Sequence, residues 1–322
     1  MKKSILSIIF GSRIFLSAAH GNFFKKYDVN PLIGTYGFPD CHASHPQLLP
    51  FLTPEEAAMD LVCEAKEGGS GTVKIATVGD SITAGVCSSS DENTYPSQLQ
   101  DLLDKAHPNA FFVTNLGACG STMQKGADSP YWDRPQFETL TSQEWDIIII
   151  MLGTNDAKDA GSGGPDNWQH DCGGKANTTT LGCTFAEDYS AMIDLVQTLG
   201  NPKIYLNVPP PLMQEGSIGA NQTVINSVFP ALLPEIVGEN SGAISGLIDV
   251  YSAMGGTVDW ESVDGWPEEC TVDDYQVWEE CAYWCDKQSC DQCHPNDAGY
   301  RVMAQAVFDG LNLSEFDRNI GI

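Results

Sequence analysis

The hydrophobic positions of this 322-residue chain fall into short apolar runs that alternate with longer amphipathic stretches. The runs are rich in branched residues and stop at Gly, Pro or Asp, which is typical of buried parallel strands. They predict strands over residues 73–78, 110–116, 145–152, 203–208 and 247–250. Helical spacing predicts helices over residues 95–106, 185–199, 223–237 and 298–311, the third despite two internal prolines.

Strands that alternate with helices predict a parallel sheet covered on both faces. In such sheets, ligands bind at the carboxyl ends of the strands. A motif that carries a candidate site residue lies at the carboxyl end of each of three expected strands. The motifs are Gly79-Asp80-Ser81, Asn115-Leu116-Gly117 and Gly153-Thr154-Asn155-Asp156. We therefore expect Ser81, Gly117 and Asn155 to converge on one edge of the sheet.

A fourth motif, Asp291-Gln292-Cys293-His294, precedes the closing helix. Together the four motifs contain the groups that acyl transfer needs. Ser81 would be the nucleophile and His294 the base, oriented by Asp291 through Nδ1. Gly117 and Asn155 would complete an oxyanion hole with the amide of Ser81. Each motif alone has a structural reading as well, since Ser81 could be a helix N-cap and His294 a surface histidine.

Two further acids in these motifs, Asp80 and Asp156, are expected to hold the loops by local hydrogen bonds. Three competing signatures do not occur in the chain: the Gly-x-Ser-x-Gly elbow, the His-Glu-x-x-His zinc motif and the phosphate-binding glycine loop. Because the four motifs suffice for acyl transfer, we expect the reaction to require no metal and no cofactor.

The four motifs, in this order and spacing, resemble those of the SGNH/GDSL hydrolase superfamily over roughly residues 72–311. The resemblance implies a flavodoxin-like, three-layer α/β/α fold with a five-stranded parallel sheet. It also implies a catalytic set of Ser81, Asp291 and His294, with Ser81, Gly117 and Asn155 as oxyanion donors. The stretch Asn207 to Leu212 and the segment from Gly153 through Trp168 look most like the carbohydrate acetylesterase branch, including sialate O-acetylesterase-like proteins.

The resulting hypothesis is a secreted serine esterase that removes short acyl groups, above all acetyl, from a carbohydrate or another small ester. Tyr131, Trp132 and Trp168 lie in loops near the motifs and could stack on a sugar ring or pack in the core. One alternative is a lipase, lysophospholipase or thioesterase on the same scaffold. A second is a glycan-binding protein that has lost turnover.

The net charge of −27 argues against nucleic acid and against stable association with an anionic membrane. The amino terminus reads as a secretory signal over residues 1–19, with Lys2 and Lys3, an apolar stretch and small residues before the expected cleavage site. We expect residues 20–71 to form an arm packed on the core, with a helix from about Thr53 to Lys66. Residues 72–322 would form the hydrolase domain, with a cysteine-rich insertion at about 252–293.

The chain contains 11 cysteines, five of them between residues 270 and 293. In a secreted protein most should pair, and disulfides are a better interpretation of this group than a zinc site. Cys172 and Cys183 could close the loop 157–183, and the group at 270–293 could staple the loop 252–293, although many pairings fit the spacing. Glycosylation sequons occur at Asn177, Asn221 and Asn312.

Overall fold

The computed structural model describes residues 41–43, 61–63, 72–173, 180–257, 260, 270–271, 280–285, 291–314 and 316. The chain divides into two units, residues 1–67 and 68–322. In the first unit, β1 (Cys41–Ala43) and β2 (Leu61–Cys63) form an antiparallel pair. The expected helix 53–66 is wrong where it overlaps β2, because pairing with a distant strand overrides local helical spacing.

The remainder of that expected helix lies outside the described residues, as do the expected signal peptide at 1–19 and the sequon at Asn177. The packing of the arm 20–71 on the core stays a prediction. Asn221, another sequon, is only 4% exposed, and its Nδ2 donates to Asp159 Oδ2 at 2.9 Å. The structure therefore leaves no room for a glycan on Asn221.

The second unit is built on a parallel five-stranded sheet with the order β4-β3-β5-β6-β7. This order is that of flavodoxin-like folds, and it confirms the predicted fold class. The strands are β3 (Val73–Gly79), β4 (Phe111–Gly117), β5 (Ile147–Met151), β6 (Lys203–Asn207) and β7 (Ile244–Ile248).

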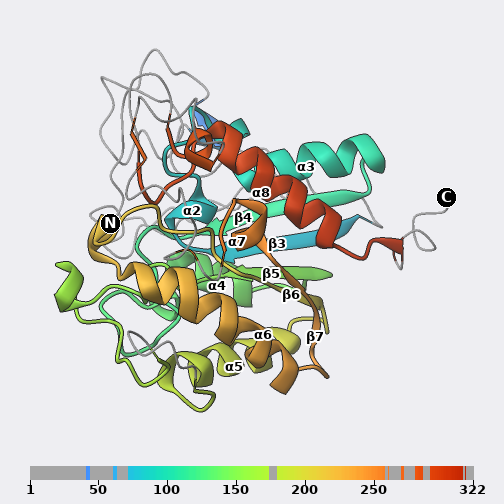
Figure 1. The fold of residues 1–322 in the computed structure, drawn as a ribbon. Coiled ribbons are helices and arrows are strands. Elements are labelled where there is room, and N and C mark those ends of the chain that lie inside the picture. Colours follow the sequence, from blue (N-terminus) through green and yellow to red (C-terminus); the bar gives the residue numbers. More distant parts are fainter. Residues whose placement is uncertain are drawn as a thin grey trace, which may run out of the picture. The chain divides into compact units, whose positions relative to one another are not determined.

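Helices cover both faces of this sheet (Figure 1). Helices α3 (Tyr95–Ala106) and α8 (Asp297–Gly310) lie side by side on one face, and α5 (Thr184–Gln197) and α6 (Phe229–Glu239) lie on the other. The shorter helices are α2 (Ser81–Ala84), α4 (Pro135–Thr141) and α7 (Val250–Ala253), with a π-turn η7 (Val224–Val228) ahead of α6. Single 3-10 turns are η3 (Asp91–Asn93), η4 (Tyr131–Asp133), η5 (Ala160–Ser162), η6 (Ser217–Gly219) and η9 (Glu280–Tyr283).

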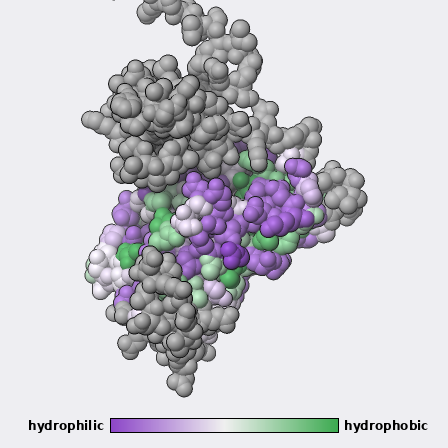
Figure 2. Space-filling model, turned by 90° about the horizontal axis from the view of Figure 1, so that it is seen from above, coloured by the Kyte–Doolittle hydropathy of each residue, from purple (hydrophilic) through white to green (hydrophobic). Residues whose placement is uncertain are grey.

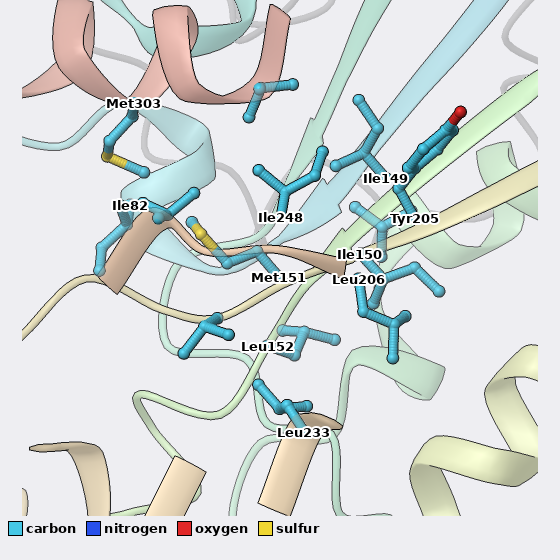
Figure 3. Close-up of a cluster of buried hydrophobic side chains, with 14 of the residues drawn as sticks. Ile82, Ile149, Ile150, Met151, Leu152, Tyr205, Leu206, Leu233, Ile248 and Met303 are labelled. Carbon is cyan, nitrogen blue, oxygen red and sulfur yellow. The ribbon is translucent and has the colours of Figure 1, made fainter. Parts of the chain in front are cut away.

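The hydrophobic core lies on both faces of the central strand β5, whose five residues are all buried. Ile149 lies beside Tyr205 and Ile150 beside Leu206, so the alternation of side chains is matched between neighbouring strands (Figure 3). Strands buried on both faces explain why the sequence shows continuous apolar runs in place of an alternating pattern.

The expected elements match the observed ones closely at α3 and β3 and less closely elsewhere. The helix expected at 223–237 is a π-turn followed by α6, with Pro230 in its first turn and Pro234 inside it. Strand β7 begins at Ile244, three residues before the expected start at Leu247. Ser245 and Gly246 interrupt the apolar pattern ahead of Leu247. Ile244 and Gly246 nevertheless pair with β6, so the start of β7 is set by pairing between strands and not by the local pattern.

On the face that Figure 2 shows, the visible described residues are mostly hydrophilic, with scattered hydrophobic side chains. This agrees with the large negative charge of the chain, −27. Within the ranges that the structure describes, no helix combines the length and the apolar character needed to cross a membrane.

Candidate active site

The candidate site lies at the carboxyl ends of β3, β4 and β5. Strand β3 pairs with β4 on one side and with β5 on the other, and Gly79 is opposite Gly117 and Met151. The chain leaves β3 first toward β4 and later returns to the other side for β5, so this edge is the topological switch point of the sheet. The expected convergence of the three motifs on one edge is confirmed.

Helix α2 starts directly after β3 and carries Ser81 in its first turn. Asp80 is its N-cap and accepts a 2.9 Å hydrogen bond from the amide of Ile82 through Oδ1. The alternative interpretation of Ser81 as the N-cap is therefore wrong. Ile82 is 1% exposed and anchors the turn in the core, near Met151 and Met303 (Figure 3), and Ser81 is 9% exposed at the rim.

Two glycines allow this turn to pack tightly against the strands. A Cβ on Gly79 would lie 2.0 Å from Thr83 Oγ1, and one on Gly117 would lie 2.2 Å from the backbone nitrogen of Ala84. Glycine is required at both positions because α2 sits directly on the ends of β3 and β4. Gly79 does not have a positive φ, so close packing is the reason that glycine is needed there.

His294 lies within hydrogen-bond distance of Ser81, although 213 residues separate them in sequence. Ser81 Oγ is 2.9 Å from His294 Nε2, and His294 Nδ1 is 3.2 Å from each carboxylate oxygen of Asp291. We assign the tautomer from these partners: Nδ1–H donates to Asp291, which leaves Nε2 to accept the proton of Ser81. This is the geometry of a nucleophile, a base and an orienting carboxylate.

Asp291 is fixed by the backbone of its own loop as well as by the imidazole. Its Oδ1 accepts from the amides of Cys293 at 2.8 Å and His294 at 2.7 Å. Burial acts to raise the pKa of Asp291, but the hydrogen bonds from the side chain and backbone of His294 and from Cys293 outweigh it and lower that pKa to about 2. The carboxylate is therefore ionised throughout the range in which an imidazole can act as a base.

The loop that carries Asp291 and His294 is braced by the cysteine-rich segment before it. Gln292 pairs with the backbone of Cys270 in both directions, at 2.9 and 2.7 Å, and its carbonyl accepts from the amide of Met213. The amide of Asp291 donates to Trp284 O. Asn296 Nδ2 donates to carbonyls of the segment 280–285, those of Ala282 and Cys285.

A second set of contacts ties the start of α8 to the loop after α2. Asp297 accepts from the amide of Ser89 at 2.7 Å and from its hydroxyl at 2.6 Å. The Tyr300 hydroxyl donates to Val86 O at 2.5 Å. These bonds hold the loop behind Ser81 against the helix that follows His294, and so they help to set the distance between the two side chains.

The expected oxyanion donors lie at the same edge, and both are engaged within the protein. Asn155 is 2% exposed, and its Nδ2 donates to Ser121 O at 3.2 Å and lies 3.4 Å from Asp80 Oδ2. The amide of Gly117 donates to Asn115 Oδ1 at 2.9 Å. The sequence predicted that both residues lie at the site, but nothing in it indicated that Asn115 Oδ1 would accept a hydrogen bond from the Gly117 amide.

Asp80 and Asp156 hold loops, as expected. Asp156 is fully buried and accepts from the amides of Met123 and Gln124, both at 2.8 Å, which fixes the loop after β4. Burial raises the pKa of Asp156 to about 7 against these hydrogen bonds. Burial also raises the pKa of Asp80 to about 6, opposed by the Ile82 amide and by His294.

The structure shows that two of the three aromatic candidates for sugar stacking pack in the core instead. Tyr131 is fully buried and donates to Leu116 O, and Trp168 is 1% exposed and packs edge-on against Phe185 and Phe229. Both rings belong to the core because each fills space beneath a loop and satisfies its polar atom there. Trp132 is half-buried, with Lys125 Nζ 4.1 Å from its ring centre, and it stays a candidate.

The cysteines that the structure describes follow the expected pattern in part. The disulfide Cys172–Cys183 closes the first long loop, and Cys270–Cys281 lies in the second. Cys285 is also disulfide-bonded, whereas Cys293 has a free, buried thiol. Cys119 is free and exposed.

One neighbour of the catalytic pair was missed in the sequence. The free thiol of Cys87 donates to Asp291 Oδ2 at 3.7 Å across 204 residues. Burial, together with the negative charge of Asp291, raises the pKa of this thiol to about 11, so it is protonated at neutral pH. No local motif signals this contact, because it joins the loop after α2 to the loop before α8.

The fold and this geometry define a flavodoxin-like α/β protein with a Ser–His–Asp arrangement at the switch point of its sheet. The family model of the GDSL-like Lipase/Acylhydrolase family matches residues 77–302, and the chain belongs to this family of ester hydrolases. The resemblance inferred from the motifs is thereby confirmed.

The chain is similar to individual proteins of known name. It is 26% identical over 254 residues to an acetylxylan esterase of Xylanibacter ruminicola, covering 73% of this chain and 42% of that protein. The chain thus spans less than half of the length of that relative. Among solved structures, one matches at 19% identity with a TM-score of 0.51, and the match covers 76% of this chain and 97% of the chain in that structure. The acetyl xylan esterase AlAXEase matches at 19% identity with a TM-score of 0.47, and the match covers 74% of this chain and 98% of that enzyme's chain.

The bracing of the catalytic loop predicts different roles for the two disulfides. In a Cys270→Ser/Cys281→Ser variant, we expect kcat to fall about 10-fold or more, because the loop with Asp291 and His294 loses its support and reacting groups tolerate little displacement. The matched control, Cys172→Ser/Cys183→Ser, also opens a disulfide of 11-residue separation and should lower the melting temperature with less than about a 3-fold change in kcat. Equal kcat in both variants, measured where both are folded, would refute the bracing.

The raised pKa of Asp156 predicts a pH-dependent stability. An acid with a raised folded pKa contributes stability that is complete below its unfolded pKa of about 3.9 and is lost as the pH rises through about 7. Asp156→Asn cannot ionise, so the stability of the wild type relative to this variant should decrease by a few kcal/mol between pH 4.5 and 7.5. Urea denaturation at both pH values measures this difference, and parallel pH profiles for the two proteins would contradict it.

Proposed function

We propose that this protein is a secreted serine esterase that removes acetyl groups from a carbohydrate. The observation that carries the proposal is the contact of Ser81 Oγ with His294 Nε2, completed by Asp291 on the other ring nitrogen. The matching family of acylhydrolases supports ester cleavage, and the similarity to an acetylxylan esterase supports an acetylated glycan as the substrate. The disulfides and the expected signal at residues 1–19 support secretion.

The reaction begins when Ser81 Oγ attacks the ester carbonyl carbon and its proton passes to His294 Nε2. Asp291 stabilises the imidazolium that forms and keeps the ring in place. His294 then gives the proton to the oxygen of the leaving sugar alcohol, which leaves an acetyl group on Ser81. A water molecule, deprotonated by His294, attacks this acyl-enzyme and releases acetic acid and free Ser81.

The oxygen that becomes negative in this reaction needs hydrogen-bond donors at the sheet edge. The amide of Ser81 is the first of α2 and has no acceptor within the helix. Asn155 supplies a side-chain N–H only by giving up the longer of its two hydrogen bonds, the one to Asp80 Oδ2 at 3.4 Å, while the bond to Ser121 O keeps the amide in position. The Gly117 amide joins them only when Asn115 turns away from it, because its one N–H is taken in the free protein.

Replacement of the nucleophile tests the reaction. Ser81→Ala removes the attacking oxygen, so hydrolysis of p-nitrophenyl acetate should fall by at least about 1000-fold while the circular dichroism spectrum is unchanged. Ser142→Ala is the matched control, since Ser142 is an exposed serine at the end of α4 and should keep wild-type activity. Activity of Ser81→Ala within 10-fold of the wild type would overturn the assignment.

The acyl specificity separates an acetylesterase from a lipase or thioesterase. We expect kcat/KM for p-nitrophenyl esters to be highest for acetate and to fall for butyrate and octanoate, and acetate to be released from acetylated xylan. A lipase would show the reverse order, because each methylene buried in an apolar groove contributes about 0.8 kcal/mol. A preference for octanoate would therefore refute the acetylesterase while leaving the serine mechanism in place.

A further inference from the structure

A group of three metal-ligating side chains lies beside the base, on the side of the imidazole away from Ser81. It consists of the Cys87 thiol, a carboxylate oxygen of Asp291 and a ring nitrogen of His294, whose ligand atoms all lie within 4.8 Å of one another. Cys87 is exposed, and Asp291 and His294 are half-buried, so solvent ions can reach the group. The proposed mechanism uses Asp291 and His294 but assigns no role to Cys87.

Two of the three distances within this group are close to those between ligand atoms around a tetrahedral zinc ion. With metal bonds of about 2.3 Å to sulfur and 2.0 Å to nitrogen and oxygen, tetrahedral ligand atoms lie about 3.3–3.6 Å apart. His294 Nδ1 is 3.2 Å and Cys87 Sγ is 3.7 Å from the same oxygen, Asp291 Oδ2. Thiolate, imidazole and carboxylate are all ligands that zinc accepts, and a water molecule can supply the fourth.

We propose that Cys87, Asp291 and His294 form a binding site for a thiophilic divalent cation such as Zn²⁺ or Cd²⁺, and that occupancy switches the esterase off. The inhibitory part of this inference rests on the proposed function of His294 as the base. The net charge of −27 favours the accumulation of cations at the surface of the protein.

The proton balance explains why a bound cation would inhibit. The metal replaces the thiol proton of Cys87, which leaves for solvent, and it takes the Nδ1 position of His294. The proton of Nδ1 then resides on Nε2, the atom that faces Ser81 at 2.9 Å. Nε2 becomes a donor toward Ser81 Oγ and can no longer accept its proton, so the nucleophile is not activated. One proton is released for each cation bound.

The test uses Cd²⁺ on the chelator-treated, full-length protein, with two readouts. Binding is followed by the ultraviolet charge-transfer absorption of a cadmium–thiolate bond, and activity by p-nitrophenyl acetate. We expect one Cd²⁺ to produce the absorption and to reduce activity at least 10-fold in parallel, with recovery on addition of EDTA. Cys87→Ser should lose the absorption, keep basal activity and require at least 10-fold more Cd²⁺ for inhibition.

Two further variants complete the design. Cys87→Gly removes the ligand and also suits the left-handed backbone at this position, where φ is 69°, so it replaces Cys87→Ser if that variant folds poorly. Cys119→Ser removes the other thiol that is free and exposed among the described residues, and it should behave as the wild type. Inhibition and absorption that persist in both Cys87 variants would overturn the site. Absorption that depends on Cys87 without loss of activity would overturn the inhibition, and it would leave the proposed function to the separate test with Ser81→Ala.

Discussion

The site depends on the parallel pairing of β3 with β4 on one side and β5 on the other. Parallel strands in one sheet end at the same edge, so this pairing places the three residues after the strands within reach of one another. The chain places β4 on one side of β3 and β5 on the other, which makes this edge the topological switch point of the sheet, and Ser81 lies at it. The tight contact of α2 with the strand ends, which the glycines permit, then fixes the direction of the serine side chain.

His294, the proposed base, is held in place by hydrogen bonds of a loop and not by the sheet. Ser81 and Asn155 follow strands of the sheet closely in sequence, whereas Asp291 and His294 lie on a loop whose described residues form no helix or strand. That loop acquires its shape from backbone bonds within it, from Gln292 and Cys270, and from the start of α8. The proposed nucleophile, Ser81, is thus positioned by the sheet, and the proposed base, His294, by a set of hydrogen bonds next to a disulfide.

Much of this architecture could be predicted from the sequence, because its signals are local. A buried strand needs a continuous apolar run and a helix needs a spaced one, and both β3 and α3 were located within a residue. The motifs could be placed at one edge because parallel topology follows from the alternation of elements. The structure confirms that expectation without reference to the family.

The errors concern features that only tertiary packing decides. For Tyr131 and Trp168 the sequence left open whether each ring stacks on a sugar or packs in the core, and the structure buries both. Helical spacing at residues 61–63 gave way to pairing with a strand 20 residues earlier. The contact of Cys87 with Asp291 joins two loops 204 residues apart, and no periodicity or motif spacing could reveal it.

The central claim is that Ser81 is a nucleophile activated by His294, and covalent labelling tests it most directly. The wild-type protein would be treated with a fluorophosphonate, its intact mass measured, and the modified residue located by peptide mapping. The account predicts a single adduct, on Ser81, whose formation is lost when His294 is replaced by Ala. An unlabelled protein, or an adduct on another serine such as Ser121, would contradict it.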